Sequence, residues 1–184
     1  MSRVSTIYLL TCAAIGVAGG VLFWSAAWVS SLLFATTQFY SVALAGLWLT
    51  PAVIGLRLLE RPLAGLLVGL MAGLVAFAYL GTSLWWSFFA ELPFLVVLYR
   101  HWRTWQYYAG AVVVAVVYPV LSAAYFNLWT IPLAAQIGFF ALTLVSCLAG
   151  VALGILIADR LRHAGVARLA RRAPGPRDTA PEER

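Results

Sequence analysis

One carboxylate of this chain lies inside a strongly apolar stretch. Glu91 stands in WWSFFAELPFLVV, residues 85–97, where its twelve neighbours are eleven apolar or aromatic residues and one serine. An acid near the centre of a membrane helix costs about 2.5–3.5 kcal/mol on insertion scales, so such acids usually face a cavity or a partner. Because no arginine is expected at the same depth, Glu91 indicates a bound ligand, a hydrogen-bonded role in helix packing, or an ion pair with another subunit.

Aromatic and polar residues expected at a similar depth could complete a ligand site. Aromatic walls with a few convergent polar groups are typical of sites for small planar ligands. Tryptophan and tyrosine also gather at membrane interfaces, so an interfacial belt is the alternative interpretation. We predict these substrate-binding residues: Glu91, Ser87, Phe88, Trp28, Tyr118, Tyr125, Asn127 and Gln136.

Signatures of catalysis and of metal binding are missing from the sequence. HExxH, GxSxG and phosphate-binding glycine loops do not occur. Cys12 and Cys147 fall in apolar stretches without a CxxC partner and suit packing positions, while His101 and His163 stand among arginines. We therefore expect no catalytic residue, no metal site, no cofactor and no enzymatic activity.

The composition indicates an integral membrane protein. Of the 184 residues, 64% are hydrophobic and 10% are charged, which is too few charges for the surface of a soluble domain. Apolar stretches of about 20 residues are long enough to cross a membrane as helices. We predict an all-α protein with six transmembrane helices, at about 7–28, 40–56, 63–80, 83–99, 107–126 and 133–158.

The arginines predict the orientation of these spans. The chain has twelve arginines and no lysine, and every arginine lies before the first span, after spans two and four, or after span six. Positive charge is retained on the cytoplasmic side, so both termini are predicted to be cytoplasmic. Glu91, about eight residues into a span that begins outside, should then lie roughly 12 Å below the outer edge. The net charge of +6 is a topology signal, and we expect no nucleic-acid partner.

Two parts of the chain are expected. Residues 1–163 form the six-helix transmembrane substrate-binding domain, and residues 164–184 form a basic, Pro-rich cytoplasmic tail that we expect to be disordered. The stretch 159–172 could also form a basic helix on anionic lipid.

A strip of small residues marks the first span. In AAIGVAGG, Ala14 and Ala18 are four residues apart, as are Gly16 and Gly20. Such a strip lets another helix approach closely, and that helix could belong to this chain or to a partner.

The order of these features resembles a known family. GGVLFWSAAW, GLWLTPAVIGLRLLERPLAGLL and the Ala90-Glu91 pair followed by Tyr99-Arg100 look like the substrate-binding S component of an energy-coupling factor (ECF) transporter. The resemblance is to the YkoE-type group for thiamine or hydroxymethylpyrimidine, and it covers about residues 15–160.

The resemblance implies a subunit of an ABC importer in a prokaryotic plasma membrane. Such a subunit would capture a vitamin from outside and work with a T component and two ATPases. By this likeness Ala14 and Ala18 would contact the T component, and Glu91 would take the place of the family's intramembrane glutamate. A carboxyl group there could bind an aminopyrimidine by two hydrogen bonds. Bulky Trp85, Trp86, Phe88 and Phe89 could narrow the pocket towards the pyrimidine alone or reshape it for another vitamin.

Two other functions remain open from the residues alone. The chain could be a non-transport membrane subunit in which Glu91 forms an intersubunit ion pair. It could also be a proton-coupled secondary carrier in which Glu91 takes up the proton.

Overall fold

The computed structural model describes residues 6–36 and 38–165, and this part of the chain is helical without any strand. The helices are α1 (Thr6–Thr36), α2 (Gln38–Ser41), α3 (Thr50–Leu59), α4 (Ala64–Val75), α5 (Leu80–Val96), α6 (Thr104–Leu121) and α7 (Leu133–His163). Three 3-10 helices connect them: η1 (Val42–Trp48), η2 (Phe77–Tyr79) and η3 (Leu128–Thr130).

Six helical segments correspond in position to the six predicted spans, because α2, η1 and α3 follow one another as one segment. Four segments are long and apolar enough to cross a membrane: Thr6–Phe34, Phe39–Leu59, Thr104–Leu121 and Leu133–His163. The other two, α4 and α5, have 12 and 17 residues. The all-helical class is therefore confirmed, while the six crossings and the cytoplasmic termini stay predictions. Most of the predicted tail, from residue 166 on, lies outside the described residues.

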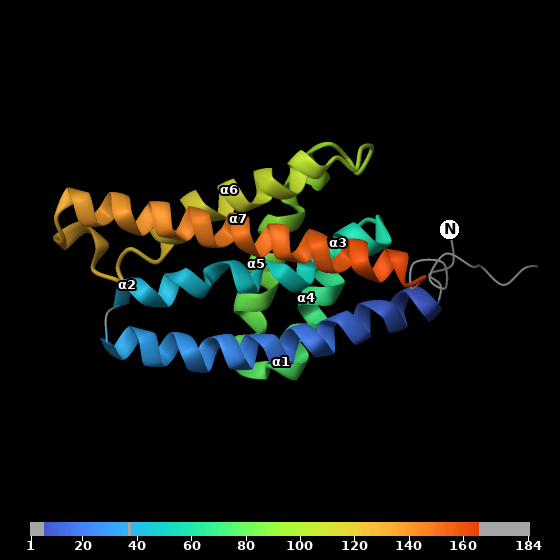
Figure 1. The fold of residues 1–184 in the computed structure, drawn as a ribbon, viewed down its shortest axis with the longest axis horizontal. Coiled ribbons are helices and arrows are strands. Elements are labelled where there is room, and N and C mark those ends of the chain that lie inside the picture. The colour runs from blue at the N-terminus through green and yellow to red at the C-terminus, as the bar shows by residue number, and fades with distance from the viewer. Residues whose placement is uncertain (1–5, 37, 166–184) are drawn as a thin grey trace, which may run out of the picture.

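The long helices share one direction and the short ones cross it. In Figure 1, α1, α3, α6 and α7 run along the long axis of the molecule, and α4 and α5 lie across that direction. α4 packs between α1 and α5, α5 continues to α6, and α6 packs on α7. α7 then contacts η1 and α3, and α3 contacts α4, so the helices enclose a main core, with two smaller clusters beside it.

Glycine residues let α4 pack closely against two other helices, α1 and α5. On the α1 side, a Cβ at Gly20 would come within 2.6 Å of the Val75 side chain. On the α5 side, Gly65, Gly69 and Gly73 recur every four residues, and a Cβ on any of them would crowd α5 or the neighbouring Leu56. Small residues at such intervals let helix backbones approach closely in membranes. The short helix α4 is thus held on both faces by backbone proximity.

The closest crossing joins η1 and α7 at two glycines. A Cβ at Gly46 would overlap the carbonyl oxygen of Ser146, and a Cβ at Gly150 would overlap the carbonyl oxygen of Gly46. The Ser146 hydroxyl accepts from the Gly46 N–H at 2.9 Å and donates to the Ala43 carbonyl at 2.7 Å. Thr50 Oγ1 lies 3.2 Å from the carbonyls of both Gly46 and Gly150. These two hydroxyls satisfy the polar groups of a 3-10 backbone in an apolar interior.

Substituting Ser146 by alanine should destabilise the protein. The change leaves the buried Gly46 N–H without its acceptor, at a cost of about 1–3 kcal/mol. The free energy of unfolding in detergent measures the effect. Ser25→Ala is a suitable control. The Ser25 hydroxyl donates to the Val21 carbonyl of its own helix, 3.0 Å away, at an exposed position. Equal stability of the two variants would contradict the role given to Ser146.

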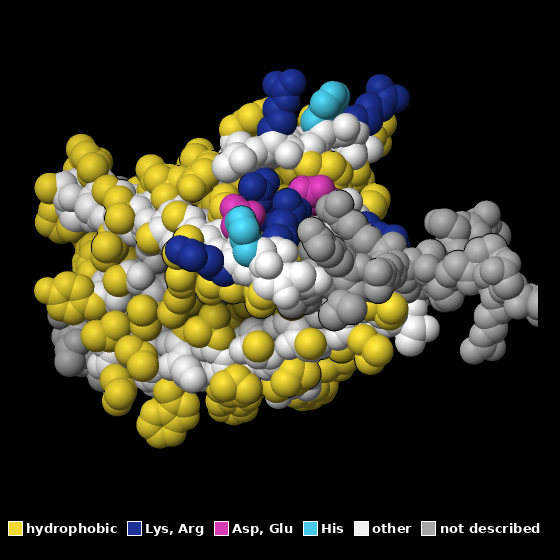
Figure 2. All heavy atoms as spheres, turned by 45° about the vertical axis from the view of Figure 1, so that its right-hand side comes forward, with side chains coloured by type: hydrophobic (Ala, Val, Ile, Leu, Met, Phe, Trp, Pro, Cys, Tyr) yellow, Lys and Arg dark blue, Asp and Glu magenta, His cyan; other side chains and the backbone are white. Residues whose placement is uncertain are grey.

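Charged side chains gather at one end of the molecule, which Figure 2 turns towards the viewer. Arg57 and Asp159 join α3 to α7 at 3.1 Å, and Arg162 and Glu60 pair at 2.6 Å. Arg162 also donates to the backbone carbonyl of Arg57. This arginine-bearing end also carries the exposed turn between α5 and α6, with Arg100 and Arg103.

Candidate functional site

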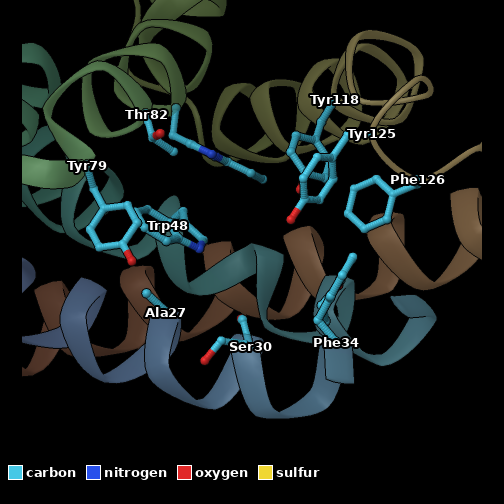
Figure 3. A pocket seen from close by; sticks show the side chains of 12 residues that line it. Ala27, Ser30, Phe34, Trp48, Tyr79, Thr82, Tyr118, Tyr125 and Phe126 are labelled. Carbon is cyan, nitrogen blue, oxygen red and sulfur yellow. The ribbon is translucent and has the colours of Figure 1, made fainter. Parts of the chain in front are cut away.

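A cavity of about 440 Å³ lies at the end away from the arginines (Figure 3). Five helical segments and the turn after α6 contribute to its walls. The lining residues are Ala27, Ser30, Ser31 and Phe34 of α1, Ser41, Trp48, Tyr79, Thr82, Trp86, Tyr118, Tyr125 and Phe126. No lining residue carries a formal charge, and the polar atoms available are hydroxyl groups and indole N–H groups.

Aromatic contacts fix the walls of this cavity. Trp48 stacks on Phe23 with a centroid distance of 4.6 Å and meets Tyr79 edge-on at 5.4 Å. Trp86 is buried and lies 5.1 Å from the ring of Tyr118. Figure 3 shows Tyr118 and Tyr125 next to each other on one wall, with Trp48 across from them and Ser30 and Phe34 on α1. Such a box can hold a flat ring between aromatic faces, with hydrogen bonds at its edge.

The turn after α6 closes the cavity on one side. Asn127 has a left-handed backbone with φ of 48°, a conformation that asparagine tolerates better than most residues. The reversal is held by the Leu128 N–H, which donates to the Ala123 carbonyl at 2.8 Å. It places Phe126 against Phe139 of α7 at 4.9 Å and Tyr125 against Phe34 of α1 at 5.5 Å. Asn127 therefore shapes the turn while its neighbours line the cavity.

The structure brings together only some of the predicted binding residues. Tyr118 and Tyr125 line the cavity. The side chain of Trp28 is 66% exposed and that of Phe88 is 42% exposed, so both face outwards. Ser87 is buried where a Cβ on Gly69 would overlap its hydroxyl. Gln136 donates to the Ile131 carbonyl at 3.0 Å and lines a separate apolar cavity between α6 and α7.

Glu91 lies outside the cavity and nearer to the arginine-bearing end than the sequence indicated. Its side chain is 1% exposed. One carboxylate oxygen accepts from the Leu66 N–H at 2.9 Å, and the other accepts from the Tyr99 hydroxyl at 2.9 Å. The helix α5 starts at Leu80 and ends at Val96, so Glu91 is only five residues, or about 7.5 Å, from its last residue. The helix begins earlier than predicted, so Glu91 lies in its second half, while its depth below the outer edge of a membrane stays a prediction.

Several residues that line the cavity were not among the predicted binding residues, which were those expected at a depth similar to that of Glu91. A signal for the α1 wall exists: Ala27, Ser30, Ser31 and Phe34 recur at three- and four-residue intervals and form one face of a helix. Trp48 gave no separate signal, since tryptophan is common in membrane proteins for other reasons. Trp86, which was expected to shape the pocket, does line the cavity.

The structure also shows the exposure of the small residues of α1 and of the two cysteines. Ala14 and Ala18 are exposed on α1, whereas Gly16 and Gly20 of the same strip are buried against α4. Cys12 and Cys147 are both buried. Within residues 6–36 and 38–165, no group of three or more His, Cys, Asp or Glu side chains could hold a metal ion.

Comparison with protein families identifies the class. The family described as "ABC-type cobalt transport system, permease component" matches residues 7–117, more than half of the chain. The protein belongs to this family. The comparison with curated proteins finds no significant match.

The fold agrees with this class. A solved structure described as "Crystal structure of an S-component of ECF transporter" is similar with a TM-score of 0.78 and 15% sequence identity, covering 89% of this chain and 88% of that chain. The resemblance to S components is thereby confirmed for the fold. The family is that of the permease component of a transport system, and the fold is that of a solved S component. The protein is a multi-pass plasma-membrane protein.

Proposed function

We propose that this protein is the substrate-binding S component of an ECF-type importer and that it captures thiamine or its hydroxymethylpyrimidine precursor from outside. The observation that carries the proposal is the aromatic cavity, whose volume of about 440 Å³ suits a small organic molecule. Family and fold limit the class to transport. The YkoE-type subgroup is part of this proposal.

The proposed topology places the cavity outside. All six helical segments cross the membrane in this proposal, with both termini and the arginine-bearing end in the cytoplasm, as positive charge favours. The short helices α4 and α5 cross within the bundle, where α4 packs on α1 and α3, and α5 packs on α4 and α6. The cavity then opens at the uncharged, outer end.

The chemistry of the walls favours a flat, nitrogen-containing ring. Aromatic side chains such as Trp48, Trp86 and Tyr118 can stack on an aminopyrimidine. The same faces attract the delocalised positive charge of a thiazolium ring. The hydroxyls of Tyr118, Tyr125 and Ser30 can donate to or accept from ring nitrogens and an exocyclic amine. Binding in this proposal takes place without Glu91.

Cobalt is the second candidate cargo, because the family description names it. Divalent first-row metal ions such as cobalt are held in proteins by imidazole, thiolate or carboxylate ligands. The side chains that line the cavity offer none of these groups. This difference supports an organic cargo.

Partners follow from the class. An S component works with a T component and two ATPases, and we propose that the exposed Ala14 and Ala18 on α1 contact the T component. The buried Glu91, with both carboxylate oxygens accepting hydrogen bonds within this chain, is not on a surface where it could pair with another subunit.

A titration of the purified protein distinguishes the cargoes. Thiamine, hydroxymethylpyrimidine and Co²⁺ are added separately in detergent, and tryptophan fluorescence is recorded with free tryptophan amide as the control for light absorption by the ligand. We expect saturable quenching by thiamine or hydroxymethylpyrimidine, because Trp48 and Trp86 line the cavity. Trp86→Phe should reduce the amplitude, whereas Trp105→Phe, which changes an exposed residue at the other end, should not. A saturable response to Co²⁺ alone, reversed by chelation, would overturn the organic cargo.

A further inference from the structure

The one buried acid of the described helices has hydrogen-bond partners in two other segments. Glu91 on α5 accepts one hydrogen bond from the backbone of α4, at Leu66, and one from the Tyr99 hydroxyl in the turn after α5. Neither bond involves the cavity or a cation. The carboxylate therefore joins the start of α4, the end of α5 and the turn at the arginine-bearing end.

The start of α4 needs an acceptor that its own sequence does not supply. The residue before it, Leu63, has a left-handed backbone with φ of 63° and offers no side-chain cap. The first N–H groups of a helix have no partner within the helix and carry partial positive charge. Glu91 reaches one of them, the Leu66 N–H, from the neighbouring helix. It thus replaces the missing cap.

Glu91 is also the last member of a polar row along α5. Ser83, Ser87 and Glu91 recur every four residues, and they lie against Gly69 and Gly65 of α4. Ser83 donates to the Gly69 carbonyl at 2.6 Å, and a Cβ on Gly65 would lie 3.1 Å from the Glu91 carboxylate. The missing side chains of α4 leave room for the polar side chains of α5. The two helices therefore form one hydrogen-bonded unit.

The turn after α5 has a backbone that requires support. Leu98 and Tyr99 have φ values of 51° and 56°, a left-handed conformation that is unfavourable for such side chains. The Tyr99 N–H donates to the Phe94 carbonyl at 2.8 Å, and its hydroxyl is held by Glu91. Burial and the hydrogen bond to Glu91 raise the pKa of Tyr99 to about 12, so the hydroxyl keeps the proton that it donates.

We propose that Glu91 is a hydrogen-bond clamp that keeps the arginine-bearing end closed by joining α4, α5 and the 97–99 turn. The clamp is a conformational device separate from the substrate cavity, and it does not depend on which cargo is bound. It requires two hydrogen-bonding atoms on the side chain but no net charge. This requirement separates it from a proton carrier or an ion-pair partner, for which glutamine would be as harmful as leucine.

The two native cysteines allow a direct test. Cys12 is 1% exposed and lies in electrostatic range of Glu91, whereas Cys147, a member of the same core cluster, does not lie in that range. Cys147 is 0% exposed on α7. Maleimide labelling is measured on the full-length protein in detergent, without ligand, in the Cys147→Ser background and in the Cys12→Ser background. Opening of the clamp exposes Cys12 alone, whereas general unfolding exposes both cysteines.

We expect Glu91→Leu to accelerate labelling of Cys12 by about tenfold or more and Tyr99→Phe by about fivefold, as the loss of one or two hydrogen bonds would. Labelling of Cys147 should stay within about twofold. In Glu91→Gln the amide oxygen can accept from the Leu66 N–H while the amide NH2 donates to the Tyr99 hydroxyl oxygen, so Cys12 should be labelled within about threefold of the wild-type rate. If Glu91→Leu does not fold, Tyr99→Phe decides the question.

Three results would overturn the clamp: Glu91→Gln labelling as fast as Glu91→Leu, equal acceleration at both cysteines, or no acceleration in Tyr99→Phe. Failure of the cargo proposal is visible separately, as the absence of saturable quenching in the wild-type protein.

Discussion

Tryptophan at position 30 will weaken ligand binding by at least about a hundredfold, a loss of about 2.7 kcal/mol of binding free energy. Ser30 lies on α1 and its side chain lines the cavity. Figure 3 shows it across from Tyr118 and Tyr125, so an indole in its place would occupy the space for the ligand. The backbone of α1 is regular at this position and needs no change to carry the larger side chain.

The controls for Ser30→Trp place tryptophan at two nearby positions of the same helix. Val29 and Leu32 are 46% and 61% exposed and point away from the bundle. Val29→Trp and Leu32→Trp should therefore bind the ligand as the wild type does, by the same fluorescence titration. If Ser30→Trp binds the ligand as tightly as the wild type does, the ligand site lies outside the cavity.

Alanine at Gly150 will lower the free energy of unfolding by at least about 3 kcal/mol, at the upper end of what overpacking a core costs. The added Cβ would overlap backbone atoms of Gly46, and a backbone cannot move aside as a flexible side chain can. Separating α7 from η1 would also break the hydrogen bonds of Ser146 and Thr50. The whole interface on this side of the bundle is affected.

Gly138 provides a matched control on the same helix. Nothing lies within 4 Å of a Cβ added there. Gly138→Ala should leave stability unchanged or raise it by about 0.5–1 kcal/mol, because alanine favours a helix over glycine. Denaturation of both variants in detergent measures the contrast. Similar effects of the two substitutions would show that helix propensity, and not the crossing, determines the outcome.

The sequence predicted the helical segments well because each one is apolar over its length. The predicted and observed segments overlap throughout, and their boundaries at Arg61 and Pro62, and at Arg100 and His101, fall between helices. The change to a 3-10 helix in η1 was not predicted, since it depends on Gly46 meeting Gly150 about a hundred residues later. Contacts of this range leave no local pattern.

The site was less predictable than the fold. Glu91 drew attention as an isolated acid, and its hydrogen-bonded packing role was one of the alternatives that the sequence left open. Its partners, a backbone N–H and the hydroxyl of Tyr99, cannot be recognised from residue types because every residue but proline has such an N–H. The cavity walls come from five separate segments, so no single stretch of sequence describes them.

The change of helix type in the second segment also sets an angle. Successive residues turn by about 120° in a 3-10 helix and about 100° in an α-helix, so the seven residues of η1 accumulate about 140° of extra rotation. This rotation determines how Ser41, just before η1, is turned relative to Trp48 at its end, and both residues line the cavity. A substitution that returned η1 to the α form would turn Ser41 relative to Trp48, and the cavity would lose part of its wall without any change to a residue that lines it.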